Sequence, residues 1–303
     1  MRWFETPNFD FVNKRKIAYV VSGILLLASL AGIIGKGLQY GIDFSGGKEF
    51  VLEFEQPVEV TSIRSELTGP LGGTPEVKRF GSPQDILIRT DASGDINSVQ
   101  NSIVSTVQEM HPGNEVSVIK TDVVGPRFAE DLKQGAVNAI IFAMVIIFIY
   151  ILIRFKNWTF SLGAVAALFH DIIIVLGVFT IFSGIAPFSM EIDQTIIAAF
   201  LTIVGYSLND TVVVYDRIRE NMLDHKGMEF LPMINKSMND TLSRTVITSL
   251  TTLFVVTVLF IFGGEVLKGF SFALVLGVII GTYSSLFVAT SVVVELELRQ
   301  KEE

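Results

Sequence analysis

The sequence predicts an α-helical polytopic membrane protein with six transmembrane helices and one extracytoplasmic α+β domain. Three observations lead to this fold class. Half of the 303 residues are apolar and only 18% are charged, a balance that no ordinary soluble domain of this length has. Six apolar runs reach the length of about 20 residues that a helix needs to cross a hydrocarbon core of roughly 30 Å. One long hydrophilic stretch separates the first run from the second.

The expected spans are residues 17–35, 134–153, 160–182, 194–215, 244–262 and 269–293. Lys and Arg set their orientation, because positive residues in short loops stay in the cytoplasm. Among the termini and the short loops, one side of the membrane carries twelve of these residues, namely Arg2, Lys14, Arg15, Lys16, Arg154, Lys156, Arg217, Arg219, Lys226, Lys236, Arg299 and Lys301. The short loops of the other side carry Lys268 alone. Both termini are therefore expected in the cytoplasm.

This orientation divides the chain into five parts. The division is a cytoplasmic N-terminus (1–16), the first span (17–35), an extracytoplasmic domain (36–133), a bundle of the other five spans (134–293) with a cytoplasmic loop (216–242), and a cytoplasmic C-terminus (294–303). The first span also has the basic flank and apolar stretch of a signal peptide. Its run of about 18 apolar residues is long for such a segment and no clean Ala-x-Ala site follows, so we expect it to stay in the protein.

The extracytoplasmic domain has a recognisable order of segments. Strand-like patterns occur at 48–56, 75–80, 85–90 and 115–124, and helical patterns at 60–67 and 95–110. The order β-α-β-β-α-β is that of the ferredoxin-like fold, in which the chain enters and leaves at one end of the sheet. An irregular loop is the alternative. The net charge of the domain is −6, from 9 Lys and Arg against 15 Asp and Glu, which argues against a nucleic-acid partner on that side.

Two glycine-bearing motifs bracket this domain. "GIDFSGG" (41–47) follows the first span, and "VGPRF" (124–128) precedes the second. We expect hinges at these motifs, since paired glycines suit a tight turn and a proline ends a strand. The hinge residues would be Gly41, Asp43, Gly46, Gly47, Gly125 and Pro126. A phosphate site is a weaker interpretation, because neither a Lys-Ser/Thr pair nor a helix follows the glycines.

The fourth span carries a carboxylate, Asp210, before its apolar run has ended. A charge inside a membrane costs about 2.5–3.5 kcal/mol on insertion scales, and such residues are functional by default. Arg244 begins the fifth span at a similar depth, so we expect it to meet Asp210, directly or through water. Alternatively, Arg244 only reaches the interface with its long side chain. A supporting polar stripe is expected from Tyr206, Ser207, Asn209 and Thr248.

A second ionisable pair lies in the third span, where His170 and Asp171 interrupt an apolar run. A proton relay and a hydrogen bond between packed helices are equally compatible with this pair. No other chemistry is apparent. The chain has no cysteine and three scattered histidines, and shows no phosphate loop, metal-ligand cluster or nucleophile with a base. We therefore expect no enzyme activity, no metal and no cofactor.

The motifs "YGIDFSGG", "VGPRF", "FHDIIIVLG", "IVGYSLNDTVVVYDRIREN", "SRTVITSLTTL" and "LKGFSFALVLGVIIGTYSSLFVA" occur in this order along the chain. In sequence and order they resemble the SecF family, the membrane subunits of the bacterial SecD–SecF protein-export complex. The resemblance covers nearly the whole chain. It implies a fold of the resistance-nodulation-division type, in which these six helices pair pseudo-symmetrically with six helices of SecD.

The same resemblance implies a function. It implies a multi-pass protein of the bacterial cytoplasmic (inner) membrane that works with SecD as an obligate partner. The complex would use the proton-motive force to help the SecYEG channel move unfolded preproteins, after the SecA ATPase has begun the work; YajC is a candidate further partner. Asp210 and Arg244 match the proton-pathway positions of the family, and a further Asp would come from SecD.

Two alternatives remain at this stage. One is a proton-driven exporter of small molecules or lipids on the same fold, because fold alone does not fix function. The other is a passive assembly subunit, against which Asp210 and Arg244 argue. The residues do not distinguish H⁺ from Na⁺ as the coupling ion. In the sixth span, Gly269, Gly277, Gly281 and Ser285 are expected to let helix backbones approach closely.

Overall fold

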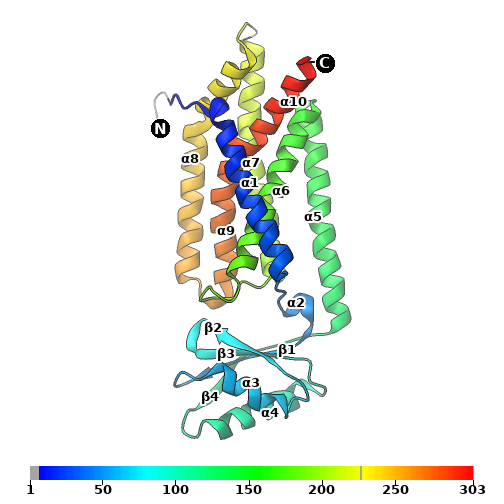
Figure 1. The fold of residues 1–303 in the computed structure, drawn as a ribbon, viewed down its shortest axis with the longest axis vertical. Coiled ribbons are helices and arrows are strands. Elements are labelled where there is room, and N and C mark those ends of the chain that lie inside the picture. Colours follow the sequence, from blue (N-terminus) through cyan, green and yellow to red (C-terminus); the bar gives the residue numbers. More distant parts are fainter. Residues whose placement is uncertain (1–6, 226, 303) are drawn as a thin grey trace. The chain divides into compact units, whose positions relative to one another are not determined.

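The structure, a computed structural model, describes residues 7–225 and 227–302 and separates into two compact units (Figure 1). The first unit contains the chain up to Leu38, then Asn138–Phe182, then the chain from Thr195 onward. The second unit contains Gln39–Val137 and Ser183–Gln194. Arg2 and Lys226, two of the basic residues used for the expected orientation, lie outside the described residues.

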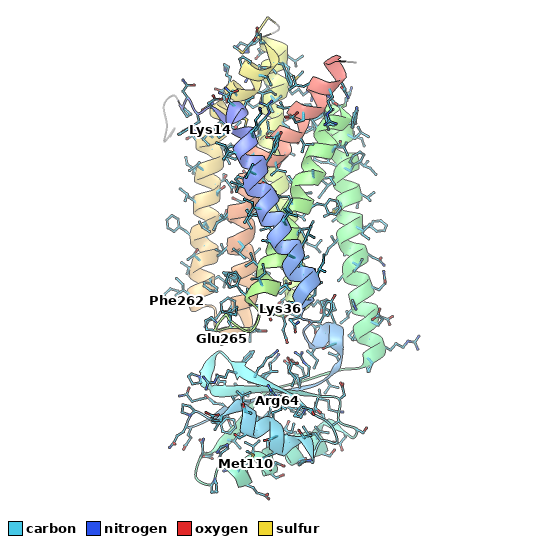
Figure 2. The ribbon with its side chains drawn as sticks, in the orientation of Figure 1. Lys14, Lys36, Arg64, Met110, Phe262 and Glu265 are labelled. Atoms are coloured by element: carbon cyan, nitrogen blue, oxygen red, sulfur yellow. The ribbon has the colours of Figure 1, made fainter. Side chains whose placement is uncertain are left out.

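Six helices of the described residues are long and apolar enough to cross a membrane, which confirms the expected number of spans. Five are α1 (Phe11–Lys36), α5 (Pro126–Phe155), α6 (Trp158–Phe182), α7 (Gln194–Asp224) and α8 (Phe230–Phe262). The sixth runs through α9 (Glu265–Ser284), a π-helical turn (Ser285–Ala289) and α10 (Thr290–Glu302). Apolar side chains such as Phe262 project from the outer faces of these helices, where lipid or partner helices fit (Figure 2).

The helices extend beyond the expected spans. The cytoplasmic loop expected at 216–242 is almost entirely helical, since α7 continues to Asp224 and α8 begins at Phe230. Ion pairs explain how polar residues continue these helices. Asp240 on α8 receives hydrogen bonds from Lys236, one turn earlier, at 2.8 Å and from Arg217 on α7 at 2.7 Å. Pairs of opposite charge at this spacing stabilise a helix outside the apolar slab.

The second unit contains a four-stranded antiparallel sheet. After the short helix α2 (Ile42–Ser45), the elements are β1 (Gly47–Phe54), α3 (Val60–Thr68), β2 (Glu76–Phe80), β3 (Ser82–Thr90), α4 (Ile96–Met110) and β4 (Val116–Val124). Their order is the β-α-β-β-α-β order expected from the sequence. The strand order across the sheet is β2-β3-β1-β4. The first and last strands are thus antiparallel neighbours, with Gly47 opposite Val124.

One face of the sheet packs against α3 and α4. The alternate residues Phe50, Leu52 and Phe54 of β1 are at most 2% exposed and share a core with the apolar stripe of the helices. That stripe consists of Ile63, Leu67, Val99, Ile103 and Val107, at the i, i+4 spacing that places residues on one face of a helix. The intervening residues of β1 point to the other face of the sheet, and among them is the buried carboxylate Glu49.

Segment 183–194 belongs to the second unit, although the sequence predicted only a short loop there. Its last residues run beside residues 39–41. Ile192 donates its backbone N–H to Gln39 at 2.7 Å, and Gly41 donates to Ile192 at 2.9 Å. Backbone hydrogen bonding between segments some 150 residues apart cannot be read from local periodicity, because a three-residue pairing leaves no pattern.

In the first unit, α1 and α6 approach closely at Gly177. A Cβ added at Gly177 would lie 2.2 Å from the Cβ of Ser29 on α1 and 2.5 Å from its Cα. Because the obstacle is partly backbone, no side-chain rotation relieves the clash. Close approach of this kind is how small residues hold membrane helices together.

We therefore expect Gly177→Ala to force α1 away from α6 and to lower the free energy of unfolding by about 1–3 kcal/mol, the usual cost of overpacking. The measurement is the midpoint of thermal unfolding of the full chain in detergent. Gly205→Ala on α7 is the matched control, because nothing lies within 4 Å of its added Cβ. Equal midpoints for the two variants would contradict the close contact.

Candidate functional site

The carboxylate of Asp210 is buried among three helices. The side chain lies on α7 and the residue is 3% exposed. Ser249 Oγ of α8 donates to Asp210 Oδ2 at 3.5 Å. The same hydroxyl lies 2.7 Å from Thr282 Oγ1 of α9, which donates to the Val278 carbonyl at 2.6 Å. A hydroxyl of α8, itself linked to α9, thus faces the buried carboxylate.

Arg244 lies near this carboxylate without pairing to it. The structure places no ion pair within 4.0 Å between these two residues, both of which it describes. Arg244 is exposed, and its charge still interacts electrostatically with Asp210. Helix geometry explains the difference from the expected direct contact, since Ser249 comes five residues after Arg244, or about 140° around α8. The hydroxyl that donates to Asp210 therefore lies on a different side of α8 from Arg244, and Thr248, one turn after Arg244, lies between the two.

The expected polar stripe of α7 divides between two faces. Ser207 is fully buried, whereas Asn209 is exposed. The Tyr206 hydroxyl is buried and has no hydrogen-bond partner among the described residues. On α8, Thr248 donates to the Arg244 carbonyl at 3.0 Å and also interacts with the Asp210 side chain. Of the stripe residues, Thr248 is the one whose contact supports Asp210.

A second buried carboxylate lies next to the first. Asp171 of α6 is 0% exposed, and its Oδ2 accepts from Ser207 Oγ of α7 at 2.7 Å and from Ser284 Oγ of α9 at 2.8 Å. Its Oδ1 lies 3.0 Å from Nδ1 of His170. The Nε2 atom of His170 is 3.1 Å from Ser22 Oγ of α1. The pair is therefore part of a hydrogen-bonded network across four helices.

The two carboxylates share helices. Ser207 and Asp210 lie three residues apart on α7, so they occupy neighbouring positions on one side of that helix. On α9, Ser284 donates to Asp171, and Thr282 contacts Ser249, whose hydroxyl faces Asp210. Close approach permits this arrangement: a Cβ added at Gly281 would lie 3.1 Å from the Ser207 Cβ. The π-helical turn that follows at Ser285 is of the kind often found at functional sites.

In the second unit, the two glycine motifs meet. Gly46 and Gly47 have φ of +75° and +105°, which favour glycine, and a Cβ at Gly46 would lie 3.3 Å from the Pro126 Cα. Gly125 has open space around it, and Pro126 is the first residue of α5, where its missing N–H costs nothing. The start of β1 and the start of α5 are thus packed together.

The same region holds the start of α7. A Cβ at Gly41 would lie 2.9 Å from the Asp193 Cβ, so glycine allows segment 192–193 to approach. Asp43 Oδ2 accepts from the backbone N–H of Gln194, the first residue of α7, at 2.9 Å. A carboxylate at this position satisfies a free N–H and complements the helix dipole. Asp43 is therefore an N-terminal cap of the helix that carries Asp210.

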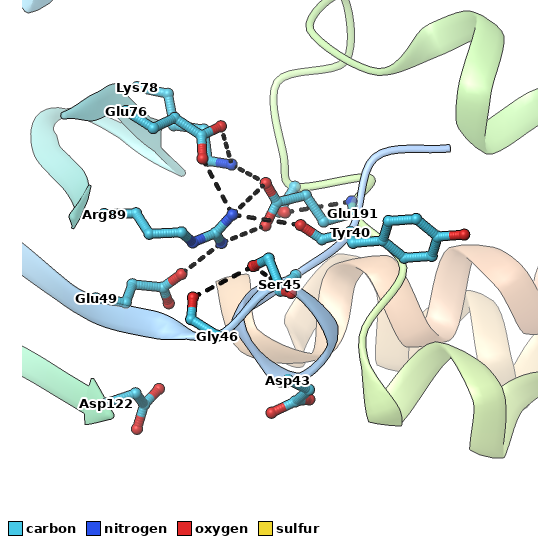
Figure 3. Close-up of polar contacts among 12 residues, drawn as sticks. Tyr40, Asp43, Ser45, Gly46, Glu49, Glu76, Lys78, Arg89, Asp122 and Glu191 are labelled. Carbon is cyan, nitrogen blue, oxygen red and sulfur yellow. Dashed lines mark hydrogen bonds and ion pairs between the residues drawn. The ribbon is translucent and has the colours of Figure 1, made fainter. Parts of the chain in front are cut away.

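A cluster of charges fixes segment 183–194 to the sheet (Figure 3). Arg89 of β3 donates to Glu49 of β1 at 2.7 Å, to Glu191 at 2.8 Å and to Glu76 of β2 at 3.0 Å. Lys78 of β2 also pairs with Glu191. The guanidinium of Arg89 and the carboxylate of Glu49 have side chains 9% and 6% exposed. Buried charges of this kind persist only when they are paired and hydrogen-bonded.

Charge pairing overrides burial in this cluster. Burial by itself would raise the pKa of Glu191, but hydrogen bonds from Arg89 and the charge of Lys78 outweigh it and the pKa is lowered. For Arg89, burial opposes the charge, and Glu191 and Glu49 more than compensate, so that its pKa is raised. Both groups are therefore charged in the folded protein.

The sequence predicted the buried ionisable residues of the membrane unit better than the residues that pair with them. Glu191 gave a weak signal, as one of two carboxylates in a short loop, and Arg89 gave another, as a charge among the apolar residues of "DILIRT". Ser249 lies in the quoted motif "SRTVITSLTTL" and Ser284 in "GTYSSLF", but neither differs in type from its neighbours. Ser22 gave no signal, because a single serine is ordinary in a membrane helix.

Comparison with known proteins places this geometry in a family. The family model "Protein export membrane protein SecD/SecF, C-terminal" matches residues 103–299, and "SecD/SecF GG Motif" matches residues 31–58. Protein translocase subunit SecF of Rhodothermus marinus is 60% identical over 99% of this chain and 96% of its own length. The subunit of the same name from Calditerrivibrio nitroreducens is 41% identical over 94% and 93%.

A solved structure agrees with these relatives. The crystal structure of SecDF, a translocon-associated membrane protein of Thermus thermophilus, matches 98% of this chain with a TM-score of 0.86 and 33% identity. The chain spans 40% of the length of that protein.

For the charge cluster, we expect Glu191→Gln to loosen segment 183–194 from the sheet and to make its stability less dependent on pH. The stabilising contribution of a carboxylate with a lowered pKa is full above its ordinary value of 4.5 and is lost as the pH falls through the lowered folded value. Hydrogen exchange of segment 183–194 in the full chain, followed from neutral to acidic pH, measures this. Wild type should lose protection on acidification, and the variant should be weakly protected throughout.

Two further variants test the same cluster. Arg89→Met leaves Glu49 and Glu191 buried without their main counter-charge and should cost about 3–5 kcal/mol. Glu66→Gln on the exposed side of α3 is the matched control and should behave as wild type. Protection in Glu191→Gln that matches wild type at every pH would mean that backbone pairing alone holds the segment.

Proposed function

The chain belongs to the SecF family of protein translocase subunits, and from this premise we propose that it couples ion movement through the membrane to preprotein export. In this proposal it works with a SecD protein and uses the proton-motive force to promote translocation through a SecYEG channel, with YajC as a candidate further partner. It lies in the bacterial cytoplasmic membrane with both termini in the cytoplasm. The observation that carries the proposal is the buried carboxylate of Asp210.

The surroundings of Asp210 suit a group that gains and loses a proton. A charge in this setting costs about 2.5–3.5 kcal/mol, and the Ser249 hydroxyl of α8 offsets part of that cost. Arg244 interacts with the carboxylate through space without a direct ion pair that would hold it permanently charged. A small movement of α8 against α7 therefore changes the balance between the charged and neutral forms.

The energy available is sufficient to bias a conformational change. One proton that crosses 100 mV yields about 2.3 kcal/mol, which shifts an equilibrium about fiftyfold. That amount does not unfold a domain, whose stability is about 5–15 kcal/mol. The mechanism therefore needs elements that move as rigid bodies between two arrangements.

The second unit supplies such an element in this proposal. We assign it to the ferredoxin-like topology, and the fold as a whole to the resistance-nodulation-division type. The sequence suggested coupling through residues 36–47 and 125–133. The Arg89 cluster and the Asp43 cap support a third route, through segment 183–194 into α7. Any shift of the domain relative to its tethers then acts on the start of the helix that carries Asp210.

The partner is inferred from α8. Arg244, Thr248 and Thr251 place polar groups on one side of a helix whose most apolar stretch is only 11% buried. An exposed arginine beside threonines is costly against lipid but fits a partner helix that brings a carboxylate. We infer that a SecD protein supplies such a helix, since this chain spans 40% of the SecDF protein that it resembles. An exporter of small molecules is not favoured, because the curated relatives are named as translocase subunits.

We expect Asp210→Asn to insert and assemble normally and to lose ion-driven export, because the amide keeps the size of the carboxyl group but cannot change charge. The measurement is late-stage preprotein export in membrane vesicles that contain the partner proteins. Asp224→Asn, at the exposed end of the same helix, is the matched control and should export as wild type. Full export by Asp210→Asn would remove this residue from the mechanism.

The same vesicles identify the ion. If the coupling ion is H⁺, wild-type export stops when the proton gradient is dissipated while a sodium gradient is kept. Export that follows the sodium gradient would overturn this choice and leave the role of Asp210 open to Na⁺, which a carboxylate also binds.

Substitutions of Arg244 distinguish a functional charge from an anchor at the membrane interface. An anchor at the interface is replaced well by lysine, whose flexible ammonium reaches the headgroups equally. A planar guanidinium that acts on Asp210 is not replaced well by lysine. Arg244→Lys should therefore move the pH at half-maximal export, and Arg244→Met should abolish export. The measurement is export rate against pH at equal protein levels. Superimposable curves for wild type and Arg244→Lys would show that the arginine is an anchor.

A further inference from the structure

The hydrogen-bond network around His170 specifies where its protons lie. Four oxygen and nitrogen groups follow one another between α6, α1 and α9, each within bonding distance of the next. His170 Nε2 is 3.1 Å from Ser22 Oγ, Ser22 Oγ is 3.0 Å from Tyr283 Oη, and Tyr283 Oη is 3.0 Å from the Ala18 carbonyl oxygen. Each hydroxyl carries a single proton, so the direction of one bond fixes the next.

The direction of each hydrogen bond in this network follows from the Ala18 carbonyl at its end. The Ala18 oxygen can only accept, so the Tyr283 hydroxyl donates its proton to it. The contact between Ser22 and Tyr283 then needs the proton of Ser22. Because Ser22 has no second proton, the contact with His170 has to be donated by Nε2. A ring that donates from Nε2 is protonated at that atom.

The other ring nitrogen faces a carboxylate. Nδ1 lies 3.0 Å from Asp171 Oδ1, whose partner oxygen already accepts from Ser207 and Ser284. A proton therefore lies between Nδ1 and Oδ1, whichever of the two atoms holds it. Together with the proton on Nε2, the His170–Asp171 pair holds one proton more than a neutral imidazole beside a carboxylate.

We propose that His170 and Asp171 form a second proton-binding site of the membrane unit, at which Nε2 of His170 takes up and releases one proton. The ligand is H⁺ itself. The site is separate from Asp210, and the proposal does not rest on the role proposed for that residue. Both sites adjoin α7 and α9, through Ser207 and Ser284 at one and through Asp210 and Thr282 at the other.

Release of the proton changes the links between helices. Without it, Nε2 becomes an acceptor and Ser22 turns its proton toward the ring. Tyr283 then has one proton for two acceptors, Ser22 and the Ala18 carbonyl, so one of these two contacts is lost. Both contacts join α9 to α1. The proton therefore strengthens the attachment of α1 to α9, and its loss weakens it.

The surroundings of the ring contain few other titratable groups. In the part of the chain that the structure describes, the groups in contact with His170 are Asp171 on its own helix, Ser22 on α1 and Tyr283 on α9, whose ring lies 6.1 Å from the imidazole between centroids. Ser207 and Ser284, behind Asp171, are neutral. Asp210 lies three residues after Ser207 on α7.

The test reads the protonation of Nε2 directly. The full chain, labelled with ¹⁵N in the histidine rings, is reconstituted in lipid vesicles and studied by solid-state NMR at neutral pH. His111→Gln and His225→Gln leave His170 as the only histidine. If that double variant does not fold, the spectrum of His170→Gln is subtracted from that of the unsubstituted chain. We expect a protonated Nε2.

Tyr283→Phe is the diagnostic variant. It removes the hydroxyl that takes the proton of Ser22, so Ser22 is free to donate to Nε2, and Nε2 should lose its proton. Tyr150→Phe, an exposed tyrosine on α5, is the matched control and should give the wild-type spectrum. In the export assay, Tyr283→Phe should displace the pH profile and Tyr150→Phe should not.

Two results would overturn the proposal. One is an unprotonated Nε2 in wild type from neutral to mildly acidic pH. The other is a Tyr283→Phe spectrum identical to that of wild type. Asp210→Asn should leave the ring signal unchanged, so this test and the export test of Asp210 can succeed or fail independently.

Discussion

A carboxylate removed from water in a membrane helix has to find its hydrogen bonds on neighbouring helices, and this requirement organises the membrane unit. Asp171 is satisfied by hydrogen bonds from α6, α7 and α9. Asp210 accepts a hydrogen bond from Ser249 of α8, which also contacts Thr282 of α9. Serine and threonine side chains are short, so these bonds form only where the backbones lie close. The polar sites therefore require the tight helix packing.

The small residues of α9 meet that constraint. Gly277 and Gly281 lie against Ile203 and Ser207 of α7, as a helix that must approach its neighbour requires. The close contact expected for the sixth span is thus seen at two glycines. Next to it the helix passes through a π-helical turn, where Thr290 Oγ1 donates to the Ser285 carbonyl at 3.2 Å. A helix that changes its hydrogen-bond register beside two carboxylates has a natural place to adjust when their charge changes.

The sequence predicted the centres of the site and not their partners, for a physical reason. Asp210, His170 and Asp171 are conspicuous because ionisable groups are rare in apolar runs. Hydroxyl residues are common there, so nothing local marks Ser22 as the partner of a histidine 148 residues away. The order of strands and helices along the chain followed from periodicity, since strands and helices repeat at 2.0 and 3.6 residues. The Arg244 contact was predicted from the similar depth of the two residues on consecutive antiparallel helices, and the structure has an electrostatic interaction between them without a direct ion pair.

The helix α7 begins beside the charge cluster and carries residues of both carboxylate sites. Its N-terminus is capped by Asp43 and follows Glu191 of the charge cluster, and its middle carries Ser207 and Asp210. Sixteen residues separate Gln194 from Asp210, or about 24 Å of continuous helix. In the proposed mechanism, a displacement of the capped end of α7 is carried along this helix to Asp210 and to Ser207, which donates to Asp171. Conversely, in the same mechanism, a change of charge at either carboxylate alters the packing of α7 against α9 and acts on the same capped end.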